Sequence, residues 1–242
     1  MKRLVLVCIM STTIFLSGCD TLKNVANSLS AFEVAQGLKE ALTQGLFSGF
    51  DAFANPNKGN PLVRFAFPGE AEKIEKTLRD LGLSSVVNNV TAKYTNAMSQ
   101  AVKQAKPIFL NSVKNMNITD AMNILLSNNQ HAATEYFKKS MSPQLMTAFR
   151  PIVDSTVRVS GAGSEYSKIV SAYNAIPLVT KKLEPNLNDF IAARAIDAMF
   201  LYVANKEEEI RSNISARNTP LLQRVFGYAD MHKGINSGGN RN

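Results

Sequence analysis

The sequence AIDAMFLYVA at residues 195–204 is the most apolar helical stretch of this chain. Only Asp197 interrupts it, and Asn188 upstream is a suitable N-cap. A helix that is apolar on every side is one that a protein buries. We therefore expect this helix to form the centre of the fold, buried nearly all round.

Helical periodicity recurs on both sides of this stretch. Apolar residues three and four positions apart predict further helices, beginning near residues 31, 70, 84, 108, 118, 132, 142, 164 and 221. Residues 62–67 alternate between apolar and other side chains and form the one segment that resembles a strand. The pattern predicts an all-α single domain of about eight helices, with no partner strand for a sheet.

Prolines and glycines refine the expected helices. Pro143 follows a serine cap, which predicts a helix start at that point. Pro151 lies inside the same helix and is expected to kink it unless the helix has already ended. Gly37, Gly45 and Gly49 lower the helix propensity of the first helix. They therefore indicate a close crossing with another helix.

The beginning of the chain has the layout of a secretory signal. Lys2 and Arg3 precede an apolar run over residues 4–15, which is too short to span a bilayer. The following Leu-Ser-Gly-Cys at residues 16–19 resembles the lipobox of bacterial lipoproteins. That resemblance implies cleavage before Cys19, a diacylglyceryl group on its thiol, and an acyl chain such as palmitate on the new amino terminus. The alternative is an ordinary secreted protein that is cut nearby and keeps Cys19 free.

The lipobox and the helical pattern together divide the chain. The expected parts are a signal peptide (1–18), a lipidated tether (19–29), a helical domain (30–227) and a tail (228–242). The tether, about ten residues long, reaches at most roughly 35 Å, which keeps the domain close to the membrane. Gly227 is expected to end the last helix, and the Gly- and Asn-rich tail that follows is expected to be disordered.

The compartment follows from the same segment. Asp20 directly follows the lipidated cysteine, and by resemblance to enteric lipoprotein sorting this favours retention in the inner membrane, facing the periplasm. Removing the leader leaves 25 basic and 19 acidic residues, a formal charge of +6. This surplus can favour an anionic membrane surface. The basic residues are scattered and the chain is exported, so nucleic acid is not an expected partner.

Catalytic and metal-binding chemistry has few candidate residues. His131 and His232 are the only histidines, and Cys19 is the only cysteine of the mature chain. A metal site needs several converging ligands, so we expect neither a metal nor another cofactor. No nucleophile elbow or phosphate-binding glycine loop is present. These observations predict that the protein is not an enzyme.

Two acidic features deserve separate interpretations. Asp197 lies in an apolar run, where an unpaired charge is costly to bury. We favour a structural ion pair with Arg194 or Arg150, and the alternative is a pocket acid with a raised pKa. The Glu run at 207–209 is interpreted as a solvated helix end, with Glu207 paired to Arg211.

Five spaced segments together resemble one known family. They are GLKEAL (37–42), KPIF (106–109), FRPIV (149–153), YNAIPLV (173–179) and LQRVFG (222–227). They are similar to the bacterial lipoprotein family known as the domain of unknown function 4197 family, over roughly residues 30–227. The resemblance implies a mostly helical envelope lipoprotein and implies no activity.

The functional expectation combines these observations. We expect a non-enzymatic binding or scaffolding module, anchored to the membrane through Cys19, that serves an envelope protein or an apolar ligand. A carrier of a lipid-like ligand would need a cavity, for which Gly45, Gly49 and Phe50 near the 195–204 helix are candidates. An enzyme, with Asp197 as its acid, is the alternative from another class.

Overall fold

A computed structural model describes residues 30–47, 50–55, 61–80, 82–177 and 180–237. Within these ranges every regular element is helical, which confirms the all-α prediction. The predicted signal peptide, Cys19, Asp20 and Gly49 lie outside the described residues.

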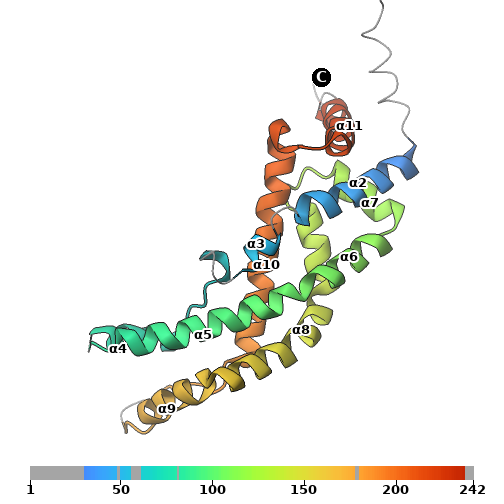
Figure 1. Cartoon of the computed structure of the whole chain (residues 1–242). Helices are drawn as coiled ribbons and strands as arrows, with labels where there is room; N and C mark the ends of the chain where they lie inside the picture. Colours follow the sequence, from blue (N-terminus) through green and yellow to red (C-terminus); the bar gives the residue numbers. More distant parts are fainter. Residues whose placement is uncertain (1–29, 48–49, 56–60, 81, 178–179, 238–242) are drawn as a thin grey trace, which may run out of the picture.

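Three long helices form the body of the molecule: α5 (Ser84–Lys103), α8 (Ala132–Ser160) and α10 (Asn188–Ser212) (Figure 1). At 1.5 Å per residue they are about 30, 43 and 37 Å long. Each packs against the other two, and Figure 1 shows α10 crossing α5.

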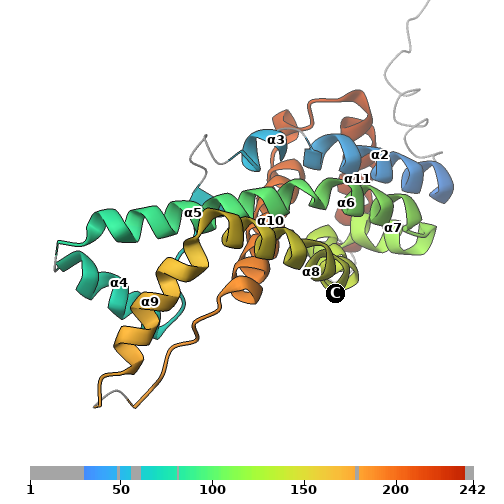
Figure 2. The same cartoon turned by 60° about the horizontal axis from the view of Figure 1, so that its bottom comes forward.

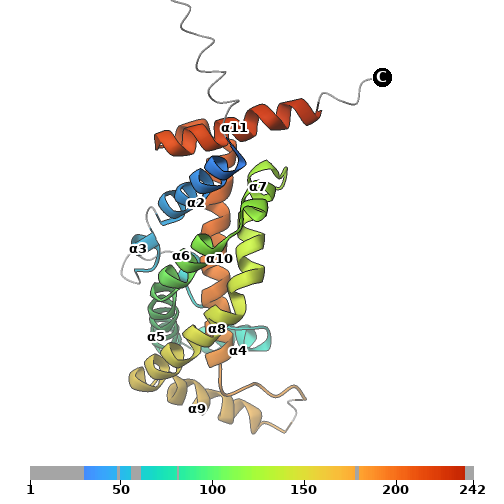
Figure 3. The ribbon, with the colours of Figure 1, turned by 90° about the vertical axis from the view of Figure 1, so that its right-hand side faces the viewer.

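Shorter helices cover the two ends of this body. At one end lie α2 (Ala31–Phe47), α7 (Ile118–Leu126) and α11 (Pro220–Ser237), with α6 (Ala105–Asn115) beside α2 (Figures 1 and 3). We call this the tether end, because α2 begins there. At the other, which we call the far end, α4 (Glu70–Asp80) and α9 (Ala162–Asn174) extend beyond the body (Figure 2). The short elements are α3 (Phe50–Phe53), η2 (Pro61–Val63) and η3 (Ile214–Ala216).

The helix that contains residues 195–204 is central, as predicted. It packs against α8, α5 and α2, and Ala195, Met199 and Phe200 are almost completely buried. The prediction that it is buried nearly all round is wrong. Arg194, Asp197 and Leu201 follow one another at helical spacing and are exposed, so among the described residues this side of α10 is uncovered.

The segment predicted to be extended does not form a strand. Residues 61–63 form the 3-10 helix η2, and residues 64–68 are irregular. The alternation is nevertheless real, since Val63 and Phe65 are buried whereas Arg64 is exposed. The Phe65 N–H donates to Thr95 Oγ1 of α5 at 3.1 Å. A side-chain oxygen therefore accepts the hydrogen bond that the backbone of a partner strand would otherwise accept.

Helix α8 is continuous where the sequence predicted two helices with a start at Pro143. Pro143 and Pro151 both lie inside it, and Figure 1 shows that the helix is bent, as prolines cause. Its buried side chains keep helical spacing through both prolines (Phe137, Met141, Leu145, Phe149, Val153, Val157). Burial of this stripe outweighs the local cost of the prolines. The helix ends at Gly161, whose φ of 72° lets α9 start after a single residue.

The last helix also continues past its predicted end at Gly227. Helix α11 extends to Ser237, so the predicted helix end at Gly227 is wrong, and residues 228–237 are helical. The continuation has its own contacts. Ala229 is buried, Asp230 pairs with Arg217 at 2.6 Å, and the His232 ring stacks on Tyr228. These contacts outweigh the preference of glycine for a helix end.

The glycines of α2 predicted a close helix crossing, and Gly37 confirms it. A Cβ atom at this position would lie 2.6 Å from Val225 Cγ2 of α11. A Cβ atom at Gly227 would have nothing within 4 Å.

This contrast between the two glycines gives a matched pair of variants. Gly37→Leu should lower the free energy of unfolding by about 2 kcal/mol, because it overpacks the α2–α11 crossing. Gly227→Ala should raise it by about 1 kcal/mol, because alanine favours the helix interior. Urea denaturation followed by circular dichroism measures both. A destabilising Gly227→Ala would show that α11 ends at Gly227 after all.

Candidate functional site

Asp197, the acid singled out from the sequence, is neither buried nor paired as predicted. Its side chain is 48% exposed and pairs with Lys138 Nζ of α8 at 3.2 Å. Arg150, one of its two expected partners, instead binds Asp189, with Nε donating to Oδ1 at 2.8 Å. Asp197 lies on the uncovered side of α10, where water solvates it. The reason for expecting a pocket acid there is therefore absent.

The place suggested for a ligand cavity is filled by aromatic side chains. The Phe50 and Tyr202 ring centroids are 5.9 Å apart, and Phe53 stacks on Tyr202 at 4.5 Å. Phe47 closes the space toward α6 by an edge contact with Phe109. Burial raises the pKa of Tyr202 to about 12. Among the described residues of α2, α3 and α10, the packed rings leave no room for a lipid-like molecule.

The histidines occupy separate elements. His131 precedes α8, and His232 lies on α11, where its Nδ1 is 2.8 Å from the Tyr228 carbonyl oxygen. Within the described ranges, no three side chains of His, Cys, Asp or Glu gather as a metal site requires. Among the described helices, none has an apolar stretch of the length that crossing a bilayer takes.

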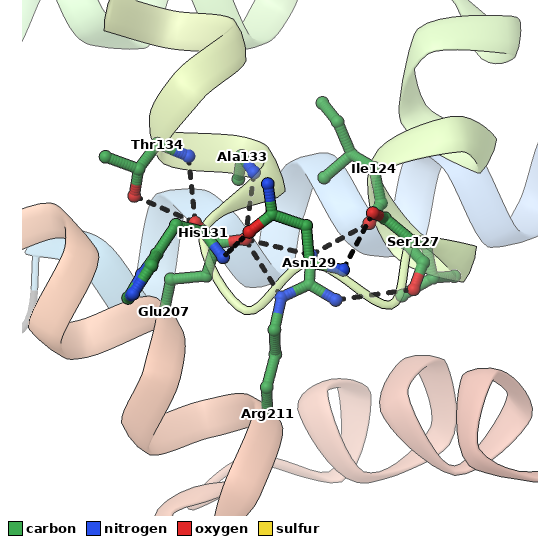
Figure 4. A network of polar contacts seen from close by, with 9 residues as sticks. Ile124, Ser127, Asn129, His131, Ala133, Thr134, Glu207 and Arg211 are labelled. Atoms are coloured by element: carbon green, nitrogen blue, oxygen red, sulfur yellow. Dashed lines mark hydrogen bonds and ion pairs between the residues drawn. The ribbon is translucent and has the colours of Figure 1, made fainter. Parts of the chain in front are cut away.

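The sequence missed a buried charged network at the tether end (Figure 4). Glu207, expected to be solvated, is only 3% exposed. Its Oε1 accepts from the Ala133 N–H at 2.8 Å, and its Oε2 accepts from the Thr134 N–H and hydroxyl at 2.8 Å. The carboxylate thus binds two amides at the beginning of α8 that have no partner within the helix. The glutamate acts as a remote cap of α8.

Arg211 completes the pair predicted with Glu207 and caps another helix. Its Nε donates to Glu207 Oε1 at 2.9 Å, and its Nη2 donates to the Ile124 carbonyl oxygen at 2.8 Å. That carbonyl belongs to the last turn of α7, where helical carbonyls lack internal partners. The pairing was therefore predicted correctly, but its burial and its reach to α7 were not.

Arg217 extends the network to α11. It is buried, and its guanidinium donates to the Ile210 and Arg211 carbonyl oxygens at the end of α10, at 3.0 and 3.2 Å. It also pairs with Asp230 of α11 at 2.6 Å. Two arginines and one glutamate therefore satisfy the ends of α7, α8 and α10 and fix α11 beside them.

One sequence signal could have located this network. Glu207 is in helical register with Val203 and Ile210, both of which are buried, whereas Glu208 and Glu209 are exposed. A carboxylate on the apolar stripe of a helix must find partners inside the protein. The ends of α7 and α8 that Arg211 and Glu207 cap were not visible, because they are more than 70 positions away in the sequence.

The far end carries an apolar cleft, which we call the far-end cleft. It lies between α4, α5 and α9, and most of its lining side chains are apolar (Ile74, Leu78, Val87, Tyr166, Ile169, Leu183). Its free volume is about 20 Å³, and Phe67 stacks on Tyr166 at its inner wall. Burial raises the pKa of Tyr166 to about 12. This volume is close to that of one water molecule, so the cleft admits the tip of an apolar side chain and is too small for an acyl chain.

A second cleft of about 260 Å³ lies between the α8–α9 corner and the start of α10. Its lining includes Asp154, Arg158 and Asn186, and Asn188 Nδ2 donates to Asp154 Oδ1 at 2.6 Å. These side chains suit a small polar solute. The roomier cleft is therefore polar, and the apolar cleft is narrow.

Comparison with known proteins gives one match. The family described as "Protein of unknown function (DUF4197)" matches residues 28–227. This range includes every element from α2 to α10 and the first turns of α11. No curated protein and no solved structure matches the chain.

The buried network predicts a large difference between neighbouring glutamates. Glu207→Ala should lower the free energy of unfolding by about 3–5 kcal/mol, because it leaves Arg211 charged and buried without its partner. Glu208→Ala, one position along the same helix but exposed, should change it by less than about 0.5 kcal/mol. Thermal and urea unfolding of the two variants tests this. Similar small effects for both would mean that residue 207 is solvated.

Proposed function

Because the chain belongs to the DUF4197 family, whose description gives no activity, we propose a function from its own residues. In this proposal the protein is a lipid-anchored, non-enzymatic docking module of the cell envelope. The helical domain holds the far-end cleft away from the membrane for an envelope protein.

The anchor part of the proposal rests on the lipobox and on where the folded body begins. Ser30 and Glu33 form the capping box of α2: the Glu33 N–H donates to Ser30 Oγ at 3.2 Å, and the Ser30 N–H donates to Glu33 Oε2 at 2.9 Å. These hydrogen bonds lower the pKa of Glu33. The body thus begins directly after the tether, which limits its distance from Cys19 to roughly 35 Å. Asp20 supports the inner membrane, with the domain in the periplasm.

The observation that carries the docking part is the packing of the interior. A lipid carrier needs a cavity, and the expected position is closed by Phe50, Phe53 and Tyr202. The far-end cleft, in contrast, is lined mostly by apolar side chains, and its free volume of about 20 Å³ admits the tip of one side chain. Protein interfaces concentrate their binding energy in such pockets, each of which receives one or two anchoring side chains. A protein segment therefore fits better than a lipid.

An enzyme has less support from the same geometry. Its least implausible acid, Asp197, forms an open surface ion pair with Lys138, and such pairs contribute only about 0–1 kcal/mol. Asp197→Asn is accordingly expected to leave both the folded state and any cellular phenotype unchanged.

The anchor is tested by Cys19→Ser. The variant should remain an unprocessed precursor that incorporates no labelled palmitate, because acylation of the thiol precedes cleavage in the lipoprotein pathway that the lipobox resembles. Normal maturation and labelling of the variant would refute the anchor. Fractionation of the unaltered protein then tests the inner-membrane assignment, with Asp20→Ser expected to redistribute it.

The docking site is tested by photocrosslinking in cells. A photoreactive side chain at Ile74 or Ile169, which line the far-end cleft, should give a discrete protein adduct. The same group at Leu201, exposed on the uncovered side of α10, is the matched control and should not give it. Equal adducts at all three positions would contradict a specific cleft. Adducts that contain only lipid would support the carrier instead.

A further inference from the structure

Three large apolar side chains are exposed on α2, η3 and α11 at the tether end. Phe32 of α2 is 57% exposed, Ile214 of η3 is 72% exposed and Met231 of α11 is 37% exposed. Single exposed apolar residues are ordinary on protein surfaces. These three differ because the elements that carry them are held together where α2 begins.

Hydrogen bonds connect η3 with α11. The Arg217 N–H donates to the Ile214 carbonyl oxygen at 3.1 Å, and the Arg217 guanidinium pairs with Asp230 at 2.6 Å. Asp230 directly precedes Met231. Ile214 and Met231 are therefore held near each other by one buried arginine.

Helix α2 is placed against the same helix. Gly37 touches Val225, and Arg224 is close enough to Glu33 to help lower its pKa. Arg224 and Met231 are seven positions apart on α11 and therefore lie on one face of that helix. Phe32, next to Glu33, is thus carried on a segment that adjoins this face.

The position of α11 determines which way the exposed side chains of the tether end point. Figure 3 shows α11 lying across the end of the molecule where α2 begins. A bilayer that faces this end would run parallel to α11, which is the orientation of an interfacial helix. The tether from Cys19 joins α2 at this end, and its reach of roughly 35 Å keeps this end within contact distance of the bilayer.

We infer that the tether end rests on the lipid bilayer, with Phe32, Ile214 and Met231 inserted among the headgroups. This inference rests on the proposed lipid anchor and adds a second, peripheral membrane contact to it. A bilayer accepts scattered apolar side chains without the shape complementarity that a protein partner needs. The nearby acids also have partners already: Glu33 caps α2, and Asp230 binds Arg217.

The chain contains no tryptophan, which allows a direct test. Phe32→Trp and Met231→Trp each introduce a single fluorophore at the tether end. Val159→Trp is the matched control, because Val159 is 82% exposed and lies at the other end of α8, beside α9. The lipidated full-length mature proteins are reconstituted into phosphatidylethanolamine and phosphatidylglycerol vesicles, with and without brominated acyl chains. Flotation reports the anchor, and quenching by bromine reports contact with lipid.

The expected result is flotation of all three variants, with bromine quenching at positions 32 and 231 at least about twofold stronger than at 159, as for side chains in the interface. Flotation with equal, weak quenching at all three positions would overturn the bilayer contact of the tether end and leave the anchor intact. Failure to float would overturn both the anchor and the bilayer contact of the tether end. Emission that shifts with protein concentration, without bromine quenching, would assign the face to a second copy of the chain and overturn the inference.

Discussion

The buried carboxylate of Glu207 is the constraint on which the tether end of the structure depends. It binds the first amides of α8 and the side chain of Arg211, which in turn binds the end of α7. Burying a charge is costly unless every partner is in place. The arrangement therefore specifies one relative position of α7, α8 and α10, and Arg217 extends it to α11. Apolar packing alone would leave these helix ends less defined.

This constraint gives the proposed function its geometry. Helices α8 and α10 begin or end in the network and continue toward the far end, so they connect the two ends rigidly. Most of the large exposed apolar side chains lie near one end or the other, and only Leu201 lies midway along α10. A lipid-anchored body of this kind can present its far-end cleft at a fixed distance and angle from the membrane. Such a role requires shape and stability, and it requires no reactive group.

The sequence predicted those features that depend on local patterns. The helical class, the central helix and the close approach at Gly37 all follow from neighbouring residues. The predictions that failed are those that tertiary contacts decide. Pro143 and Gly227 have strong local preferences for helix boundaries, but the buried stripe of α8 and the contacts of α11 outweigh them.

The charged residues show the same division. The Glu207–Arg211 pair is visible as a spacing of four, but its burial depends on amides and carbonyls more than 70 positions away. The prediction for Asp197 was wrong in the opposite sense, because this residue was expected to be buried and is exposed. Its apolar neighbours suggested burial, yet its side of α10 is exposed in the part of the chain that the structure describes. The far-end cleft is assembled from α4, α5 and α9, and no single segment predicts it.

Amide hydrogen exchange at Ala133 and Thr134 tests the central claim most directly. Amides in the first turn of a helix lack helical partners and normally exchange by local fraying. If Glu207 binds them as described, both should exchange only through global unfolding, with the same free energy of opening as the Phe200 amide in the middle of α10. Exchange at a markedly lower free energy of opening would show that Glu207 does not hold the start of α8, and would contradict the account.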